Sequence, residues 1–142
     1  MNVLIINGPN INMLGVREPE IYGGKSYADL LEYICGEAEQ LGIRPTLFQS
    51  NSEGAIVDVI QDALGKYDGI IINPAAYTHT SIAIPDALKA VAIPAVEVHL
   101  SDIYSREPFR RISYTSEACI KTITGEGFAG YASAMLVLTQ VC

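Results

Sequence analysis

Residues 3–10 read VLIINGPN: four consecutive apolar residues followed by polar and turn-forming ones. A wholly apolar run of this length is typical of a strand buried on both faces, because a strand with one face in water alternates apolar and polar residues. Strands buried on both faces occur in parallel sheets that helices cover on both sides. The start of the chain therefore favours an α/β fold.

The rest of the chain alternates strand-like and helix-like segments. Apolar runs predict further strands at residues 45–48, 69–72, 94–98 and 119–124. Apolar residues at helical spacing predict helices at about residues 26–41, 53–64, 81–91 and 129–139. This alternation produces right-handed crossovers and a parallel sheet with helices on both faces. We expect a single flavodoxin-like, doubly wound catalytic domain over residues 1–142, with five strands in the order 2-1-3-4-5.

Three local details accompany these elements. Ser50 and Glu53 have the spacing of a capping box ahead of the second helix. Leu64 and Leu136 belong to the apolar stripes of the second and last helices, so we expect both to face the core. Residues 101–116 are polar and predict a loop with one short turn of helix.

The composition excludes several classes of partner. With 9 Lys and Arg against 16 Asp and Glu, the net charge of −7 disfavours binding to nucleic acid or anionic membranes. A small anionic ligand remains compatible, because a few nearby cations outweigh a distant negative field. No apolar run is long enough to span a bilayer, and the first residues lack the features of a signal peptide. Three widely spaced cysteines argue against a disulfide framework, so we expect a protein of the reducing cytoplasm.

A long connection separates the first strand from the first helix. Residues 7–24 have no periodicity of their own, although connections in compact α/β domains usually take a handful of residues. Apolar residues within the connection argue against disorder: Met13, Leu14, Ile21 and Tyr22. We therefore expect a binding loop or lid that carries the chemistry, with Arg17 and Tyr22 as its working residues.

Polar residues follow the predicted strands at the point where each strand ends. They are Asn7 and Asn10 after the first strand, Asn73 and His79 after the third, and His99 and Ser101 after the fourth. Ligands in open α/β sheets bind outside the carboxyl ends of the strands. Both histidines of the chain therefore fall at the edge expected to bind a ligand, beside the long loop.

A tyrosine, an arginine and a histidine in this set suit proton transfer. A phenol has a pKa of about 10 and acts as a base near neutral pH only if that pKa is lowered. The guanidinium of Arg17 would favour the phenolate of Tyr22 on the same loop. His99 can give or take a proton near neutral pH.

The remaining polar residues could orient a substrate. Asn10 and Asn73 are uncharged groups that can orient hydroxyls or stabilise an enolate through a water molecule. Arg110 can pair with a carboxylate. A base, an acid, an enolate partner and a carboxylate clamp together suit abstraction of a proton next to a carbonyl, followed by elimination.

Each of these residues also has a purely structural interpretation. Tyr22 could pack the loop onto the domain, and Arg106, Arg110 and Arg111 could form a solvated basic face. Asp86 could do no more than complement a helix dipole. These interpretations do not explain why so many polar residues gather at one sheet edge.

Residues 125–130 point to a different function. Their sequence, GEGFAG, matches G-x-G-x-x-G after a strand and before a helix, which suggests a dinucleotide- or phosphate-binding module. No second strand follows to complete that unit, and no acidic residue lies about 20 positions further on. The glycines could instead permit close helix–strand packing. A non-catalytic flavodoxin-like signalling domain is a third possibility, although neither a phosphate loop nor an acidic cluster follows the first strand.

Several blocks of the sequence, in their order and spacing, resemble type II 3-dehydroquinate dehydratase. The blocks are NGPN (7–10), REPEIYG (17–23), QSNSE (49–53), NPAAYTHTS (73–81), EVHLS (97–101) and REPFR (106–110). The resemblance runs nearly from end to end of the chain.

The resemblance implies the reversible dehydration of 3-dehydroquinate to 3-dehydroshikimate in aromatic amino-acid biosynthesis. It implies an anti elimination through an enolate that needs no cofactor, no metal and no Schiff base. Tyr22 would remove the α-proton, while Arg17 depresses the pKa of that tyrosine and stabilises the transition state. Asn10 would hold a water that supports the enolate, and His99 would protonate the departing hydroxyl.

The resemblance also implies a set of substrate contacts and an assembly. The contacts are Asn73, His79, Asp86, the backbone at Leu100, Ser101 and Arg110. Glu97 would support the histidine of the same strand. The family assembles as a dodecamer of trimers, in which Asp86 can act across a subunit boundary.

The sequence departs from the family's usual residues at a few positions. Asp102 stands where Asn is usual, Tyr104 where His is common and Pro108 where an acidic residue is usual. These three surround the loop expected to bind the substrate carboxylate, so we expect them to change affinity rather than the reaction. Glu126 interrupts the usual glycine-rich run after the fifth strand.

Overall fold

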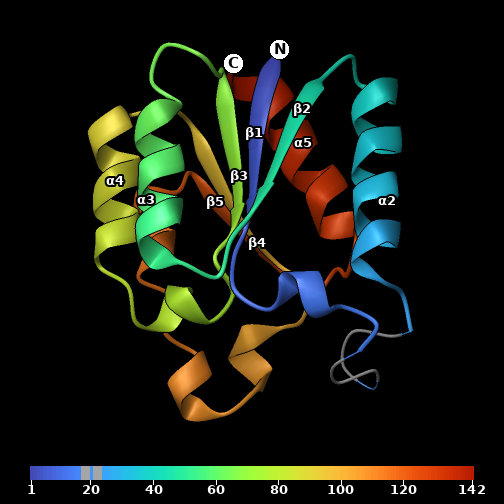
Figure 1. The fold of residues 1–142 in the computed structure, drawn as a ribbon, viewed down its shortest axis with the longest axis vertical. Helices are drawn as coiled ribbons and strands as arrows, with labels where there is room; N and C mark the ends of the chain where they lie inside the picture. Colours follow the sequence, from blue (N-terminus) through green and yellow to red (C-terminus); the bar gives the residue numbers. More distant parts are fainter. Residues whose placement is uncertain (17–19, 21–23) are drawn as a thin grey trace.

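The structure, a computed structural model, describes residues 1–16, 20 and 24–142 (Figure 1). Arg17 and Tyr22, on which the expected proton abstraction depends, lie outside the described residues.

The described residues contain a five-stranded parallel sheet in the order β2-β1-β3-β4-β5. Its strands are β1 (Asn2–Asn7), β2 (Arg44–Gln49), β3 (Gly69–Asn73), β4 (Ala95–His99) and β5 (Lys121–Thr124). Each residue of β3 and of β4 is buried, as expected for central strands covered on both faces. The predicted α/β fold and strand order are confirmed.

Helices cover both faces of the sheet (Figure 1). On one face, α2 (Tyr27–Gln40) and α5 (Ala129–Val141) enclose a core with β-strand residues such as Val3 and Ile71. On the other, α3 (Glu53–Asp62) and α4 (Ala83–Val91) enclose a second core.

The helix starts follow from local hydrogen bonds. The Ser26 side chain accepts a hydrogen bond from the Asp29 N–H, and the Asp29 side chain accepts one from the Ser26 N–H, which makes a capping box at α2. The capping box predicted from Ser50 and Glu53 is wrong: α3 is capped by Ser52, whose hydroxyl accepts a hydrogen bond from the Ala55 N–H at 3.2 Å. The Ser50 hydroxyl instead accepts one from the Ser52 N–H, before the helix begins.

Two leucines that were expected in the core are exposed. Leu64 lies beyond the end of α3, in a turn where the helical phase no longer applies, and 64% of it is exposed. Leu136 is 49% exposed because the buried face of α5 passes through Tyr131, Met135 and Leu138 instead.

The segment after β4 is more ordered than the sequence predicts. It contains three short 3₁₀ helices, η3 (Ile103–Ser105), η4 (Pro108–Arg110) and η5 (Thr115–Ala118), where one short turn was expected. In Figure 1 η3 and η4, coloured orange, lie beyond the carboxyl ends of the strands.

The register of the central strands fixes which polar residues meet. Asn7, the last residue of β1, pairs with Asn73, the last residue of β3. On β4, Glu97 pairs with Ile72, so His99 extends two residues further toward the same edge. The sheet therefore places Asn73 and His99 at one end of neighbouring strands.

Candidate active site

A cavity of about 150 Å³ lies at the carboxyl ends of β1, β3 and β4. The connections that follow these strands line it with Pro9, Asn10, Ile11, Asn73, Ala75, Ala76, His79, His99, Leu100, Ser101, Ile103, Arg106 and Arg110. The structure thus brings together most of the residues that the sequence indicated, from three separate parts of the chain.

Some predicted site residues lie elsewhere. Asp86 is exposed in the first turn of α4 and does not line the cavity. Glu97 is fully buried behind His99 rather than in the cavity wall. Arg17 and Tyr22 are not among the described residues.

A buried network holds the His99 imidazole. The His99 Nε2 lies 2.9 Å from Glu97 Oε2. The same carboxylate accepts hydrogen bonds from the Ser113 hydroxyl, at 2.7 Å on Oε1 and 2.6 Å on Oε2, and from the Thr78 hydroxyl at 3.0 Å. Three donors from three different segments therefore converge on one carboxylate.

This network favours the ionised form of Glu97. Burial alone would raise the pKa of the Glu97 carboxyl, but the hydrogen bond and charge of His99 and the hydroxyls of Ser113 and Thr78 outweigh it and lower that pKa. An ionised carboxylate only accepts hydrogen bonds, so His99 Nε2 carries the hydrogen in this contact. The Nδ1 atom of His99 is left for proton transfer to a ligand.

Replacing the carboxylate should change how stability depends on pH. Glu97→Gln is expected to lower the free energy of unfolding by roughly 2 kcal/mol near neutral pH, because hydrogen bonds to a charged group are lost. The folded-state pKa of Glu97 is lowered, so its contribution is fully present above the ordinary value of 4.5 and is lost as the pH falls through the folded value. Thermal unfolding of the wild type and of Glu97→Gln should be measured from neutral pH to below pH 4.5. The difference in their unfolding free energies should narrow as the pH falls through the folded-state pKa of Glu97. A difference that stays constant would contradict the ionised state assigned to Glu97.

Sequence reasoning missed the hydroxyls that hold Glu97. Thr78 lies within the NPAAYTHTS block, where no role at the site was expected for it, and Ser113 lies in a polar stretch with no motif of its own. They lie 19 and 16 residues from Glu97 along the chain, so no local spacing links them to it. Arg106, which lines the cavity, was noted only as part of a basic face and of the REPFR block, with no role at the site.

His79 is oriented by the backbone of the segment after β4. Its Nδ1 lies 2.7 Å from the Ile112 carbonyl oxygen, which can only accept, so Nδ1 carries a hydrogen. Burial lowers the pKa of His79, and the nearby positive charges of His99 and Arg110 lower it further. The neutral ring then has an unprotonated Nε2, which can accept a hydrogen bond from a ligand hydroxyl.

The turn after β1 is held in an unusual conformation. Asn10 has a φ of 70°, a left-handed conformation that Asn tolerates better than most residues. Its N–H donates a hydrogen bond to the Asn51 side-chain oxygen at 3.1 Å. The Gln49 amide also donates to that oxygen and to the Gly8 carbonyl. The QSNSE block (residues 49–53) therefore braces the turn that presents Asn10 to the cavity.

Gly8 has no room for a side chain. A Cβ atom there would lie 2.6 Å from the Pro74 carbonyl oxygen, because the Gly8 N–H donates a hydrogen bond to the Asn73 carbonyl at 2.8 Å. Gly8→Ala should force these two connections apart, with a loss of roughly 1–3 kcal/mol in unfolding free energy and a lower kcat/KM. Thermal unfolding and steady-state kinetics check this, with Gly36→Ala as the control because nothing lies within 4 Å of a Cβ there. Wild-type behaviour of Gly8→Ala would contradict the packing argument.

Arg110 is positioned by its own 3₁₀ helix. Its Nε forms an ion pair with Glu107 Oε2 at 2.7 Å, and its guanidinium lies over the Phe109 ring at 5.1 Å. The side chain is 25% exposed, so it is reachable from the cavity. Pro108 occupies the first turn of η4, where a missing N–H costs no hydrogen bond.

Asp102 and Tyr104, the other two residues near this segment that differ from the family's usual ones, lie outside the cavity wall. Asp102 caps η3, because its side chain accepts a hydrogen bond from the Tyr104 N–H at 3.0 Å. Tyr104 is half exposed and does not line the cavity. Among the residues that the structure describes, no group of three or more His, Cys, Asp or Glu side chains is arranged to hold a metal ion.

The fold and the cavity together define an open α/β protein with a candidate active site at the carboxyl edge of its sheet. His99, held from behind by the buried Glu97, faces one small cavity together with two asparagines and two arginines, which suits a polar substrate that carries an anionic group.

Comparison with known proteins identifies the family. The model of the family "Dehydroquinase class II" matches residues 1–139, and the chain belongs to this family. It is 56% identical over 139 residues to a 3-dehydroquinate dehydratase of Clostridium perfringens, covering 97% of this chain and 96% of the relative. It is 54% identical over 143 residues to that of Fusobacterium nucleatum, covering 99% and 97%.

Solved structures agree with this placement. The crystal structure of type II dehydroquinase from Butyrivibrio crossotus matches with a TM-score of 0.96 and 48% identity, covering 98% of this chain and 97% of that one. The type II dehydroquinase of Propionibacterium acnes matches with a TM-score of 0.90 and 38% identity, covering 99% and 94%.

Proposed function

We propose that the chain dehydrates 3-dehydroquinate to 3-dehydroshikimate in the shikimate pathway, and that the cavity at the strand ends is its active site. This hydro-lyase reaction is the activity named for the curated relatives, which cover nearly the whole chain. The observation that carries the site assignment is the buried Glu97–His99 pair, which adjoins the cavity lined by Asn10, Asn73 and Arg110. Residues 1–142 act as one catalytic domain.

The first step is removal of the α-proton. The Tyr22 phenolate takes this proton, and the electron pair of the broken C–H bond forms the enolate. Arg17 keeps Tyr22 ionised by lowering the pKa of its phenol. A water held by Asn10 donates a hydrogen bond to the enolate oxygen.

The second step is loss of the hydroxyl group. The enolate re-forms the ketone and its electrons make the new carbon–carbon double bond as the carbon–oxygen bond breaks. His99 donates a proton to the departing oxygen, which leaves as water. The Nδ1 atom performs this transfer, because Nε2 is engaged by Glu97 at 2.9 Å.

The remaining cavity residues bind the substrate. Arg110 pairs with the substrate carboxylate, and its neighbour Glu107 fixes the direction of the guanidinium. The unprotonated Nε2 of His79 accepts a hydrogen bond from a ring hydroxyl. Asn73, Ser101 and the backbone at Leu100 hold the rest of the ring.

We further propose that the chain assembles as a dodecamer of trimers, with Asp86 reaching the active site of a neighbouring subunit. Asp86 is exposed and outside the cavity of its own chain, which suits such a role. Several large apolar side chains are exposed in the single chain: Ile82, Phe109 and Ile112 are 54%, 64% and 54% exposed. Contacts between subunits would bury them, which supports an assembly. Light scattering of the purified protein measures the assembly, and a monomeric mass would overturn it.

The enzyme acts in the cytoplasm in this proposal. Among the helices of the described residues, none is both long and apolar enough to cross a membrane.

Isotope labelling tests the proposed course of the elimination. Substrate that carries deuterium on the α-carbon, anti to the departing hydroxyl, should give unlabelled product by mass spectrometry, whereas the opposite epimer should keep its label. Loss of label from the opposite epimer would overturn the anti geometry. Borohydride added with substrate should leave the activity intact, because no lysine imine forms, and inactivation would point to a Schiff base instead.

A further inference from the structure

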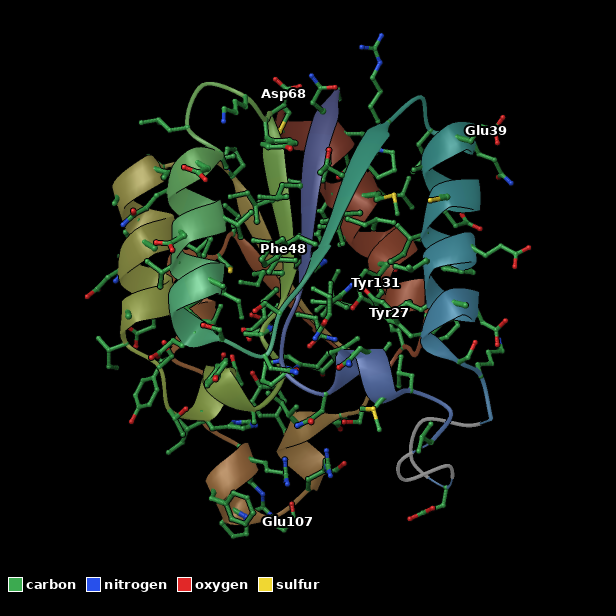
Figure 2. All side chains as sticks on the ribbon, in the orientation of Figure 1. Tyr27, Glu39, Phe48, Asp68, Glu107 and Tyr131 are labelled. Atoms are coloured by element: carbon green, nitrogen blue, oxygen red, sulfur yellow. The ribbon has the colours of Figure 1, made fainter. Side chains whose placement is uncertain are left out.

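Tyr131 connects the ends of two central strands from beneath the active site. It lies on α5, and its side chain is fully buried (Figure 2). Its hydroxyl donates a hydrogen bond to Asn7 Oδ1 at 2.6 Å and accepts one from Asn73 Nδ2 at 3.1 Å. Asn73 lines the active-site cavity, whereas Tyr131 and Asn7 do not.

The hydrogen bonds that link Asn7, Tyr131 and Asn73 fix one orientation of the Asn73 amide. A phenol has one hydrogen, and at Tyr131 that hydrogen is committed to Asn7 Oδ1, so the phenol oxygen can only accept from Asn73. The Ala75 N–H can only donate, and it lies 3.1 Å from Asn73 Oδ1. Both contacts require the same orientation of the amide. Burial raises the pKa of Tyr131, which keeps the hydroxyl protonated.

The glycine motif at residues 125–130 explains how Tyr131 reaches this position. A Cβ atom at Gly130 would lie 3.2 Å from Val98 Cγ1 and 3.5 Å from Ile123 Cγ2, so α5 sits close against β4 and β5. Gly127 donates its N–H to the Leu100 carbonyl at 3.1 Å, which ties the start of the helix to the segment after β4. The motif serves helix–strand packing, and Tyr131 is the residue that follows it.

We propose that Tyr131 is a positioning residue of the active site, which holds the Asn73 amide so that its second N–H and its carbonyl oxygen face the substrate. The proposal rests on the proposed function, because it gives Asn73 a substrate to bind. Nothing else in the described structure accepts a hydrogen bond from Asn73 Nδ2. Without the Tyr131 hydroxyl only the Ala75 N–H still holds the amide, at its oxygen, so the direction of the Asn73 Nδ2 group toward the substrate is less firmly fixed.

Tyr131→Phe tests this with the loss of a single oxygen atom. We expect KM for 3-dehydroquinate to rise about tenfold and kcat to stay within about twofold, because Asn73 binds substrate and transition state alike. Tyr27→Phe is the matched control. Burial raises the pKa of the Tyr27 phenol, and the nearby Asn7 side chain offsets part of that rise, so this hydroxyl borders Asn7 without holding Asn73. Its KM should match that of the wild type.

A double-mutant cycle separates positioning from general stability. Asn73→Ala should itself raise KM, and adding Tyr131→Phe to it should change KM no further. A merely structural Tyr131 would instead add its full effect in both backgrounds, and that result would overturn the proposal. An unchanged KM in Tyr131→Phe would also overturn it.

A second variant covers the case in which Tyr131→Phe folds poorly. That change leaves the Asn7 oxygen buried without its donor, whereas Asn7→Leu with Tyr131→Phe replaces both partners by apolar groups. The double variant still leaves Asn73 without its acceptor, so the same rise in KM is expected and a wild-type KM would refute the inference. If the wild-type protein itself fails to convert 3-dehydroquinate, the proposed function fails; a normal wild type with an unaffected Tyr131→Phe overturns the positioning role alone.

Discussion

Tyr22→Phe is expected to lower kcat roughly 10³-fold while the protein stays folded. A positioned general base typically contributes about 10²–10⁴-fold, and phenylalanine keeps the ring of tyrosine but has no oxygen to accept the α-proton. KM should change little, because the change removes one oxygen atom and keeps the apolar ring. Initial rates with 3-dehydroquinate measure the loss, and circular dichroism checks the fold.

Two further variants make this result specific. Tyr104→Phe also removes a phenol oxygen, but Tyr104 is half exposed and outside the cavity, so its activity should match the wild type. Arg17→Ala should shift the increase of kcat with pH to higher pH, because in the proposed mechanism the positive charge of Arg17 is what lowers the pKa of Tyr22. Substantial activity in Tyr22→Phe would remove Tyr22 as the base.

His99→Ala should give the second largest loss, about 10²–10³-fold in kcat, because hydroxide leaves far less readily than water. The matched comparison is His79→Ala, which removes the other histidine of the same cavity. His79 is neutral and held by the Ile112 carbonyl, so its loss should raise KM more than it lowers kcat.

The contrast between the two histidines is the informative result. Glu97→Gln should fall between wild type and His99→Ala, since it keeps His99 but loses the carboxylate that fixes its Nε2 hydrogen. If His79→Ala lost more kcat than His99→Ala, the roles assigned to the two rings would have to be exchanged.

The fold could be predicted from the sequence because its signals are periodic and redundant. Apolar runs such as residues 69–72 alternate with segments that have apolar residues at helical spacing. This pattern strongly favours a parallel sheet that helices cover on both faces. The errors at Ser50, Leu64 and Leu136 concern the ends and phase of helices. The start of α3 depends on which of several neighbouring polar residues caps the helix, and the buried face of α5 depends on how that helix is rotated against the sheet. Sequence spacing does not distinguish alternatives that differ by a single residue.

The candidate site was predictable where residues lie at the end of a strand or within a recognisable motif. Asn73 and His99 were found because parallel strands end at a common edge, and Arg110 because of its motif. Thr78, Ser113 and Tyr131 were missed, because each acts through a hydrogen bond to a residue at least 16 positions away. Such contacts are created by the packing of segments against each other and leave no spacing in the sequence.

The most direct test of the account is the reaction itself. Purified protein, treated with a metal chelator and mixed with 3-dehydroquinate, should produce a rising absorbance from the conjugated enone of 3-dehydroshikimate, and the rise should vanish with Tyr22→Phe. A flat trace from the folded wild-type protein would contradict the account, as would activity that the chelator abolishes.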